Sequence, residues 1–564
     1  MQKLLLEANH IIKHYGGRRV LDVERLAVYD GERIGLIGEN GAGKSTLLAI
    51  LAGALPPDSG AVDRRCPAAL IRQFGDAGEA GGTYGAGNAY GARLRSEFRA
   101  PEAHDGLSGG EMTRRRIASA LSENAPLLLA DEPTTDLDAA GIDRLRQRLA
   151  AHEGALVLIS HDRALLDALC TRIWHLEDGR IADFPGGYSD YQAELARRRE
   201  FQQFEYDRYR AEKARLKAMA QKKAEWAASV KKAPKRMGNS EARLHTREYT
   251  NAVLRQSQAR RIVQDRMERL EVKERPRDLP AIRMALGSAR PIAAKTALEA
   301  RNMALSAGGR TLLANAELTL PTGSRTALMG DNGCGKTTLL RALRGDVPPG
   351  VAFSGKVRWN PAARPGVFDQ DHARGLDFDA SALSNAMADS ALGESDARTV
   401  LARLNLRGDD VFKPVRVLSG GERAKIALAK LLLSDCNLLV LDEPTNHLDV
   451  FTLQALEELL AGYGGTLLLV SHDRAFVRAA ATRIVRLENQ KLCAFEGTLS
   501  QMEAAAKADR SAEARQLEIT ALEMRLAALA GRMAAPRKGD RPEALAAEYD
   551  ALAAELRNRK QSPR

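Results

Sequence analysis

The sequence predicts an α/β protein made of two tandem copies of one domain, joined by a long antiparallel helical hairpin and followed by a helical C-terminal extension. Three observations support this prediction. The glycine-rich stretch at 38–46 recurs at 330–338, and in both copies Leu-Ser-Gly-Gly-Glu and then Asp-Glu-Pro-Thr follow it. Short apolar runs alternate with helical patterns in each copy. The segment between the copies is basic and Ala-rich, with apolar residues at helical spacing.

Alignment of the two glycine-rich stretches gives the domain limits. We expect a first domain at 1–195, a basic helical linker at 196–292, a second domain at 293–500 and the helical extension at 501–564. The apolar runs 33–37, 127–130 and 155–159 have the length and composition of buried strands. Because such strands alternate with helices, each copy should contain a mainly parallel sheet.

The linker has the pattern of two helices packed antiparallel. Leu216 and Ala220 lie at helical spacing in its first half, as do Val263 and Met267 in its second half. Pro234 should end the first helix, which puts the tip near 231–243. A helix of about 35 residues at 1.5 Å per residue spans roughly 50 Å. The hairpin could therefore project well beyond the domains, and the extension after residue 500 should form one or two helices broken near Pro536.

The charge of the chain is concentrated in this linker. Residues 197–275 hold 23 Lys and Arg against 11 Asp and Glu, an excess of +12, whereas the whole chain of 564 residues carries +11. A cluster of positive charge on a helical surface is typical of proteins that bind nucleic-acid phosphates. The five cysteines form no C-x-x-C pair or metal-ligand spacing, which fits a reduced cytosol. We find no signal peptide and no run near the roughly 18 apolar residues of a membrane helix, so we expect a cytoplasmic protein with no membrane partner.

The glycine-rich stretches predict two ATP sites. A glycine-rich loop between a strand and a helix turns backbone N–H groups toward phosphates, and a lysine at its end adds charge at the β and γ positions. Tyr15, upstream of the first loop, could stack on adenine, whereas the equivalent residue of the second copy is Ala307. The expected ATP-binding residues of the loops are Gly38, Asn40, Gly41, Gly43, Lys44, Ser45 and Thr46, and Gly330, Asn332, Gly333, Gly335, Lys336, Thr337 and Thr338.

Further residues of both copies are placed for Mg²⁺ binding and hydrolysis. Each Asp-Glu-Pro motif ends an apolar run, where the aspartate can hold Mg²⁺ and the next residue can polarise the attacking water. A histidine at the end of another strand could contact the γ-phosphate, and a glutamine could approach Mg²⁺ and the water. The expected metal ligands are Ser45, Gln73, Asp131, Thr337, Gln370 and Asp442, and the expected catalytic residues are Glu132, Glu443, His161 and His472.

The ordered set of phosphate loop, glutamine, Leu-Ser-Gly-Gly-Glu, Asp-Glu-Pro and histidine resembles the ABC ATPase superfamily over nearly the whole chain. In that family two ATPase domains pack head-to-tail, and each ATP lies between one phosphate loop and the signature motif of the other domain. The resemblance implies that loop 38–46 pairs with Ser419, Gly420 and Gly421, and that loop 330–338 pairs with Ser108, Gly109 and Gly110. A Ser-Gly-Gly turn that opens a helix also offers N–H donors and a helix dipole to a phosphate. The chain would then be a monomer whose two domains dimerise within the molecule.

Two such domains with a basic helical linker and no membrane segment resemble the ABC-F subfamily of translation factors, and the tip is similar to that of its antibiotic-resistance, ribosome-protection members. The resemblance implies binding at the tRNA exit site of the ribosome, with the tip directed toward the peptidyl-transferase centre. The residues expected to touch ribosomal RNA and P-site tRNA are Lys231, Lys232, Lys235, Arg236 and Arg243. Only about 33 Gly-rich residues separate Gln73 from Leu107, too few for the inserted arm of housekeeping members, which favours the protection type.

Other interpretations remain open. A housekeeping ABC-F translation factor is the first alternative, and an exporter ATPase subunit and a DNA-associated ATPase are less favoured, since a basic hairpin does not by itself distinguish DNA from RNA. The two copies also differ in the loop after Asp-Glu-Pro, which reads Thr-Thr-Asp-Leu-Asp at 134–138 and Thr-Asn-His-Leu-Asp at 445–449. We therefore expect the two ATP sites to turn over unequally.

Overall fold

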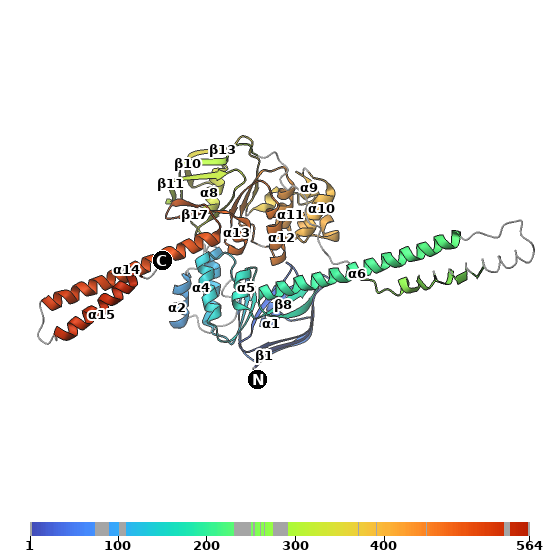
Figure 1. Ribbon diagram of the computed structural model, residues 1–564, viewed down its shortest axis with the longest axis horizontal. Helices are drawn as coiled ribbons and strands as arrows, with labels where there is room; N and C mark the ends of the chain where they lie inside the picture. The colour runs from blue at the N-terminus through green and yellow to red at the C-terminus, as the bar shows by residue number, and fades with distance from the viewer. Residues whose placement is uncertain are drawn as a thin grey trace, which may run out of the picture. The chain divides into compact units, whose positions relative to one another are not determined.

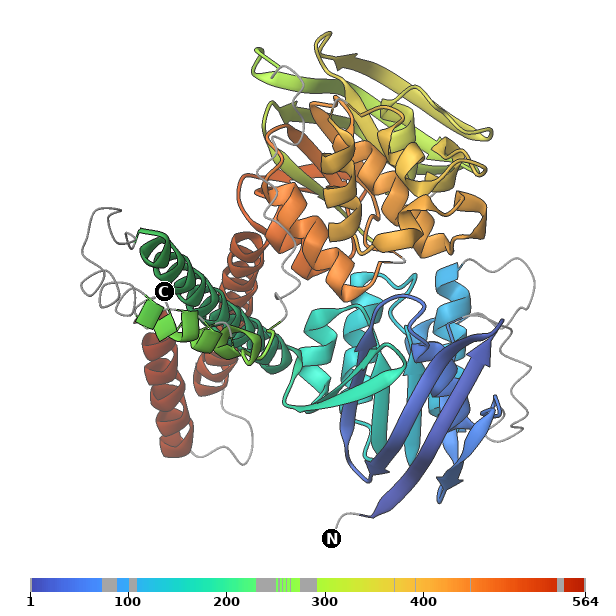
Figure 2. The ribbon, with the colours of Figure 1, turned by 90° about the vertical axis from the view of Figure 1, so that its right-hand side faces the viewer.

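A computed structural model describes residues 3–73, 89–100, 109–229, 250–251, 254–255, 257–259, 261–263, 265–273, 292–369, 371–390, 392–446, 448–534 and 542–561. The chain divides into two compact units. Unit 1 comprises Met1–Asp136 and Gly141–Ile282, and unit 2 comprises Leu137–Ala140 and Arg283–Arg564. Each unit is described by itself, and Figures 1 and 2 show the ribbon of the chain in two views that differ by a 90° rotation.

Unit 1 contains a three-stranded antiparallel sheet and a six-stranded sheet. The smaller sheet has the order β2-β1-β4, formed by β1 (Leu4–Tyr15), β2 (Arg18–Tyr29) and β4 (Ser59–Arg64). The larger sheet has the order β5-β6-β7-β3-β8-β9 and is parallel except at β9. Its strands are β3 (Arg33–Gly38), β5 (Ala68–Ile71), β6 (Leu127–Asp131), β7 (Ala155–Ile159), β8 (Arg172–Glu177) and β9 (Arg180–Pro185). The central strands β6 and β7 are buried throughout, as their apolar sequences require.

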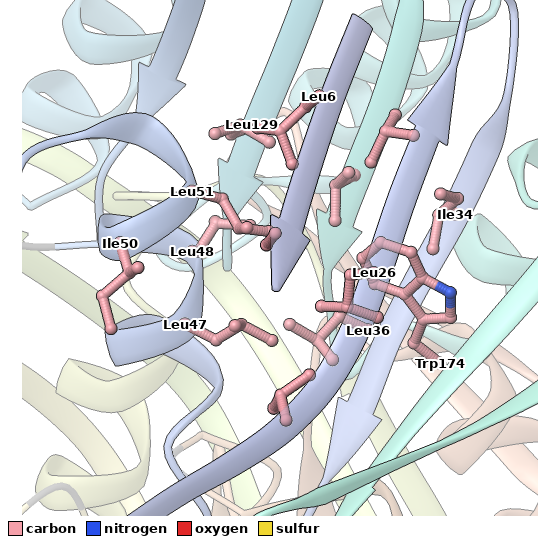
Figure 3. Packing of buried hydrophobic residues seen from close by; sticks show 14 of the residues in the cluster. Leu6, Leu26, Ile34, Leu36, Leu47, Leu48, Ile50, Leu51, Leu129 and Trp174 are labelled. Carbon is pink, nitrogen blue, oxygen red and sulfur yellow. The ribbon is translucent and has the colours of Figure 1, made fainter. Parts of the chain in front are cut away.

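The helices of unit 1 begin after the strands that carry the predicted motifs. They are α1 (Lys44–Ala52), α2 (Ala89–Phe98), α3 (Gly109–Ser122), α4 (Ala139–Ala150) and α5 (Arg163–Leu169). The core lies between α1 and the two sheets: Leu47, Leu48 and Leu51 of α1 are buried with Leu36 of β3 and Trp174 of β8 (Figure 3). This packing fixes the start of α1, and therefore the glycine-rich loop, against the end of β3.

A long helix, α6 (Tyr188–Ser229), continues from the last strand of unit 1 (Figure 1). The described residues of 250–268 are helical and return alongside α6. Glu212 of α6 lies 3.6 Å from Arg266, and Glu205 of α6 lies 3.3 Å from Lys273. The earlier residue of α6 thus pairs with the later residue of the returning segment, as in two antiparallel helices. Leu216 and Val263 are both buried. The described parts therefore form an antiparallel pair, as the periodicity of the linker predicts, whereas the tip at 231–243 lies outside the described residues.

Unit 2 repeats the plan of unit 1. Its smaller sheet has the order β11-β10-β13, formed by β10 (Thr296–Ala307), β11 (Arg310–Pro321) and β13 (Val351–Trp359). Its larger sheet has the order β14-β15-β16-β12-β17-β18 and is parallel except at β18. The strands are β12 (Arg325–Met329), β14 (Pro365–Phe368), β15 (Leu438–Asp442), β16 (Thr466–Val470), β17 (Arg483–Glu488) and β18 (Lys491–Phe495). The predicted fold class, two α/β copies in tandem, is confirmed.

The helices of unit 2 cover its sheet and form a helical layer. They are α8 (Lys336–Leu343), α9 (Ala382–Met387), α10 (Glu394–Arg403), α11 (Gly420–Leu433), α12 (Val450–Ala461) and α13 (Arg474–Ala480), with 3₁₀ turns η1 (His372–Gly375), η2 (Gly408–Phe412) and η3 (Val415–Val417). The core repeats that of unit 1, with Leu339 and Leu343 of α8 buried against Leu328 of β12 and Val485 of β17.

The extension consists of two helices, α14 (Leu499–Ala534) and α15 (Pro542–Gln561), which lie side by side (Figures 1 and 2). Leu522, Leu529, Leu545 and Leu552 form their shared core. Lys560 pairs with Glu523 at 2.7 Å across the two helices. Within the described residues, no helix of the chain is long and apolar enough to span a bilayer.

Candidate functional site

Each glycine-rich loop lies between the end of a central strand and the start of a helix. In unit 1 the loop joins β3 to α1, and in unit 2 it joins β12 to α8. The residues before the helices, Gly43 and Gly335, both have φ of +102°, a conformation that side chains disfavour. As N-cap residues, these glycines make no side-chain hydrogen bond to the first turn of the helix. The helix dipole is positive at the N-termini of α1 and α8, so an anion such as a phosphate suits these two loops.

The loop lysines are held across the loops. Lys44 Nζ donates hydrogen bonds to the carbonyl oxygens of Gly38 and Glu39, both at 2.9 Å. Lys336 Nζ makes the same bonds to Gly330 at 2.9 Å and Asp331 at 3.0 Å. Both ammonium groups are largely buried, so their positive charge acts in a medium of low dielectric constant. A phosphate in the loop would attract this charge strongly.

A buried aspartate faces the start of each helix. Asp131 ends β6 and hydrogen bonds with Ser45, and Asp442 ends β15 and hydrogen bonds with Thr337. Burial raises the pKa of Asp131 to about 6 and raises that of Asp442 as well. Oδ1 of each is buried without a hydrogen-bond partner in the described part of the chain. Each site thus combines a hydroxyl group with a carboxylate that has an oxygen without a partner. Such oxygen ligands fit Mg²⁺, which is usually held by only a few protein groups.

The next residue in each copy has a strained backbone. Glu132 and Glu443 have φ of +47° and +49°, in the left-handed region that glutamate rarely adopts. Their N–H groups donate to the last residues of β7 and β16, Ile159 at 3.0 Å and Val470 at 2.8 Å. Both carboxylates are more than nine-tenths buried. Matched strain in both copies is typical of a site where the fold fixes a reactive side chain.

A histidine meets each of these glutamates, but the two pairs differ. His161 Nε2 lies 2.9 Å from Glu132 Oε1, and His472 Nε2 lies 3.4 Å from Glu443 Oε1. Burial would raise the pKa of Glu132, but the charge of His161 and its hydrogen bond lower it below the usual range. Burial raises the pKa of Glu443 to about 7, and it lowers that of His472 to about 4. Glutamate in the first copy is therefore the more readily ionised.

The signature motif opens a helix in both copies. In unit 2, Ser419 caps α11: its Oγ accepts from the N–H of Glu422 at 3.3 Å, and the Glu422 carboxylate accepts from the Ser419 N–H at 2.8 Å. Gly420 and Gly421 form the first turn of this helix. In unit 1, α3 begins at Gly109, and Gly110 follows it, whereas Ser108 lies outside the described residues.

Two contacts were not anticipated from the sequence. Arg116 of α3 donates to the carbonyl oxygen of Arg72 at 3.0 Å and also to that of Gln73, so the signature helix holds the backbone at the predicted glutamine. In unit 2, Lys425 of α11 pairs with Asp449 at 3.0 Å, with both side chains buried. Each contact joins residues that are far apart in the sequence. The sequence therefore showed only that residues 114–116 and 425 are basic, and it did not show which groups they meet.

The structure describes some of the remaining predicted residues and leaves others outside the described part of the chain. Tyr15 ends β1 and is half exposed, and Ala307 ends β10 at the equivalent place. Burial raises the pKa of the Cys334 thiol in the second loop, which reduces its reactivity. Gln370 and the basic tip residues Lys231, Lys232, Lys235, Arg236 and Arg243 lie outside the described residues.

The chain is similar in sequence to known proteins. The family model described as "ABC transporter" matches residues 21–74 and 313–446. The "Ribosome protection protein VmlR" of Bacillus subtilis (strain 168) is 32% identical over 467 residues, which are 82% of this chain and 83% of that protein. The "Erythromycin resistance ATP-binding protein MsrA" of Staphylococcus epidermidis is 34% identical over 499 residues, 87% of this chain and 99% of that protein. The "Probable ATP-binding protein YbiT" of Escherichia coli O157:H7 is 31% identical over 548 residues, 87% and 98% of the two chains.

Among solved structures, the fold is similar to that in the "complex of archaeal ribosomal stalk protein aP1 and archaeal ribosome recycling factor aABCE1". The TM-score is 0.58 at 20% identity, and the match covers 88% of this chain and 92% of the other. At this identity the likeness concerns the fold alone.

Proposed function

Since the chain belongs to the ABC-F family of ATP-binding ABC proteins and is an ATPase, we propose that it binds the ribosome at the tRNA exit site and acts near the peptidyl-transferase centre, as a ribosome-protection factor. The names of two relatives, one a ribosome protection protein and one an erythromycin resistance protein, support this proposal. The observation that carries it is the antiparallel pair formed by α6 and the 250–273 segment. The pair lies in the linker between the two domains, where residues 197–275 carry an excess of +12, against +11 for the whole chain.

The residues of each loop have distinct roles in this proposal. Lys44 and Lys336 bind the β- and γ-phosphates, and the N-termini of α1 and α8 supply N–H donors. Ser45 with Asp131, and Thr337 with Asp442, would hold Mg²⁺. When bound, Mg²⁺ neutralises phosphate charge and supports the displacement at the γ-phosphate.

Glu132 and Glu443 are the proposed catalytic residues. Each lies beside a histidine and is held by a strained backbone at the end of a buried strand, where it can polarise the attacking water. His161 lies closer to Glu132 than His472 does to Glu443, and Glu443 has the higher pKa. The two glutamate–histidine pairs thus differ in geometry, and we infer that the two sites hydrolyse ATP at unequal rates.

Following the family's head-to-tail arrangement, we propose that each ATP also contacts a signature motif. Loop 38–46 would pair with Ser419, Gly420 and Gly421, and loop 330–338 with Ser108, Gly109 and Gly110. ATP then joins the two domains, and hydrolysis releases them. The closed form would bind the ribosome, and the basic tip residues at 231–243 would contact ribosomal RNA and P-site tRNA. Such phosphate contacts give an affinity that falls with salt.

The decisive experiment is co-sedimentation of the Glu132→Gln, Glu443→Gln chain with 70S ribosomes. These substitutions keep the shape of the side chains and remove the charge, so ATP should bind without hydrolysis and trap the closed form. We expect pelleting in ATP and little without nucleotide at the same salt concentration. The matched control is Lys44→Ala with Lys336→Ala, which should not pellet in ATP. Pelleting that is equal with and without ATP, or absent while ATP binding is intact, would contradict the proposal.

A further inference from the structure

The two copies differ most clearly at one position of the loop after Asp-Glu-Pro. Asp136 stands in the first copy where His447 stands in the second. Asp136 has φ of +61°, a left-handed conformation that aspartate and asparagine tolerate better than most residues. The question is what the carboxylate faces.

The carboxylate of Asp136 lies against the first residue of the signature helix α3. A β-carbon built on Gly109 would lie 2.8 Å from Asp136 Oδ2 and 3.2 Å from its Cγ. At Gly420, the equivalent residue of unit 2, no atom of the described residues comes within 4 Å of such a β-carbon, and His447 itself lies outside them. A negative charge therefore stands beside the N-terminus of α3, in addition to the Glu of the motif, which both copies share.

We propose that Asp136 makes the two ATP sites unequal by weakening ATP binding where loop 330–338 meets the first signature motif. The inference rests on the pairing of loops and signatures in the proposed function. The N-terminus of a helix carries roughly half a positive charge, and a nearby carboxylate offsets it. A γ-phosphate that approaches Gly109 and Gly110 would meet this carboxylate and be repelled. Loop 38–46 pairs with the second signature, where the corresponding residue is histidine and carries no negative charge.

The size of the effect follows from the electrostatics. Like charges a few ångströms apart repel appreciably at the intermediate dielectric constant of a protein surface, and salt and Mg²⁺ reduce the repulsion. We expect removal of the charge at Asp136 to tighten ATP binding at this site by about tenfold. A positive-φ backbone also favours asparagine and glycine, so these replacements retain the loop conformation.

The test measures binding of a fluorescent ATP analogue with Mg²⁺ to the full chain without ribosomes. Lys44→Ala first silences loop 38–46, so that the signal reports loop 330–338. In this background Asp136→Asn and Asp136→Gly should lower the Kd about tenfold. In the matched Lys336→Ala background, which reports the other loop, Asp136→Asn should change the Kd less than twofold. A gain with glycine alone would assign the effect to the backbone and overturn the inference, as would no gain with either replacement.

Two signature variants separate this inference from the pairing on which it rests. In the Lys44→Ala background, Gly110→Asp and Gly110→Ala should weaken nucleotide binding if loop 330–338 meets the first signature. If binding weakens in these variants and Asp136→Asn still has no effect, only the role of Asp136 is wrong. If neither Gly110 variant changes binding while thermal unfolding shows an intact fold, the pairing is wrong and the inference fails with it.

Discussion

Replacing Lys425 with methionine should destabilise unit 2 strongly, because the lysine is the buried counter-ion of Asp449. Lys425 Nζ lies 3.0 Å from Asp449 Oδ2, and the two side chains are 4% and 0% exposed. Asp449 Oδ1 accepts hydrogen bonds from the N–H of Thr452 at 2.8 Å and from its hydroxyl at 2.9 Å. The pair therefore ties the signature helix α11 to the start of α12.

The magnitude follows from the pKa of the aspartate. Burial raises the pKa of Asp449, but the charge of Lys425 and the hydrogen bonds of Thr452 lower it from its usual 3.8 to about 2. At about 1.36 kcal/mol per pH unit, this difference corresponds to roughly 2 kcal/mol of stability. That contribution is present above pH 3.8 and is lost as the pH falls toward 2. Removing the lysine alone also leaves a buried charge unpaired, so we expect Lys425→Met to cost about 3 kcal/mol.

The assay is urea unfolding, read by hydrogen exchange of peptides from β15 and α12 so that it reports unit 2. Lys413→Met is the matched control, since Lys413 pairs with Asp410 at the surface, where both side chains are about half exposed. Such a pair contributes less than about 1 kcal/mol. The double variant Lys425→Met, Asp449→Asn should recover part of the loss, because no unpaired charge remains.

The pH dependence gives a second check. Without Lys425, burial should raise the pKa of Asp449 above that of the unfolded chain. The folded state then binds more protons than the unfolded state, so the variant should lose stability as the pH rises from 5 to 8, relative to the unsubstituted chain. A cost equal to that of Lys413→Met, or one that does not change with pH, would refute this account of the pair.

Two further predictions concern the helical segments. Leu529→Ala in the shared core of α14 and α15 should lower the local stability of that helix pair by about 2–4 kcal/mol, measured as loss of hydrogen-exchange protection in α15. The control Leu517→Ala, at an exposed position, should change this protection little. Equal effects of the two substitutions would argue against this core. Replacing residues 231–243 by a Gly-Ser link should leave basal ATPase activity intact and remove protection of ribosomal RNA near the peptidyl-transferase centre in chemical footprinting. An unchanged footprint would mean that the tip does not act there.

Much of the site could be predicted from local sequence. The glycine-rich loops, the Asp-Glu pairs and the strand-end histidines are contiguous motifs, and each motif sets its own backbone geometry. The two copies also align with each other, so each motif could be identified in both. The alignment pairs Tyr15 with Ala307, and the structure places these two residues at the ends of the equivalent strands β1 and β10. The helical pairing of the linker followed from its spacing, since a period near 3.6 identifies one apolar face.

The sequence by itself determined the duplicated α/β fold, the two phosphate loops and the basic helical linker, because local backbone preferences and hydrophobic periodicity encode them. The tertiary structure decided which distant groups meet. It brought Lys425 to Asp449 and Asp136 to Gly109, and it placed His161 nearer to its glutamate than His472. Such contacts depend on how helices and strands pack, and burial then sets pKa values that no local motif specifies.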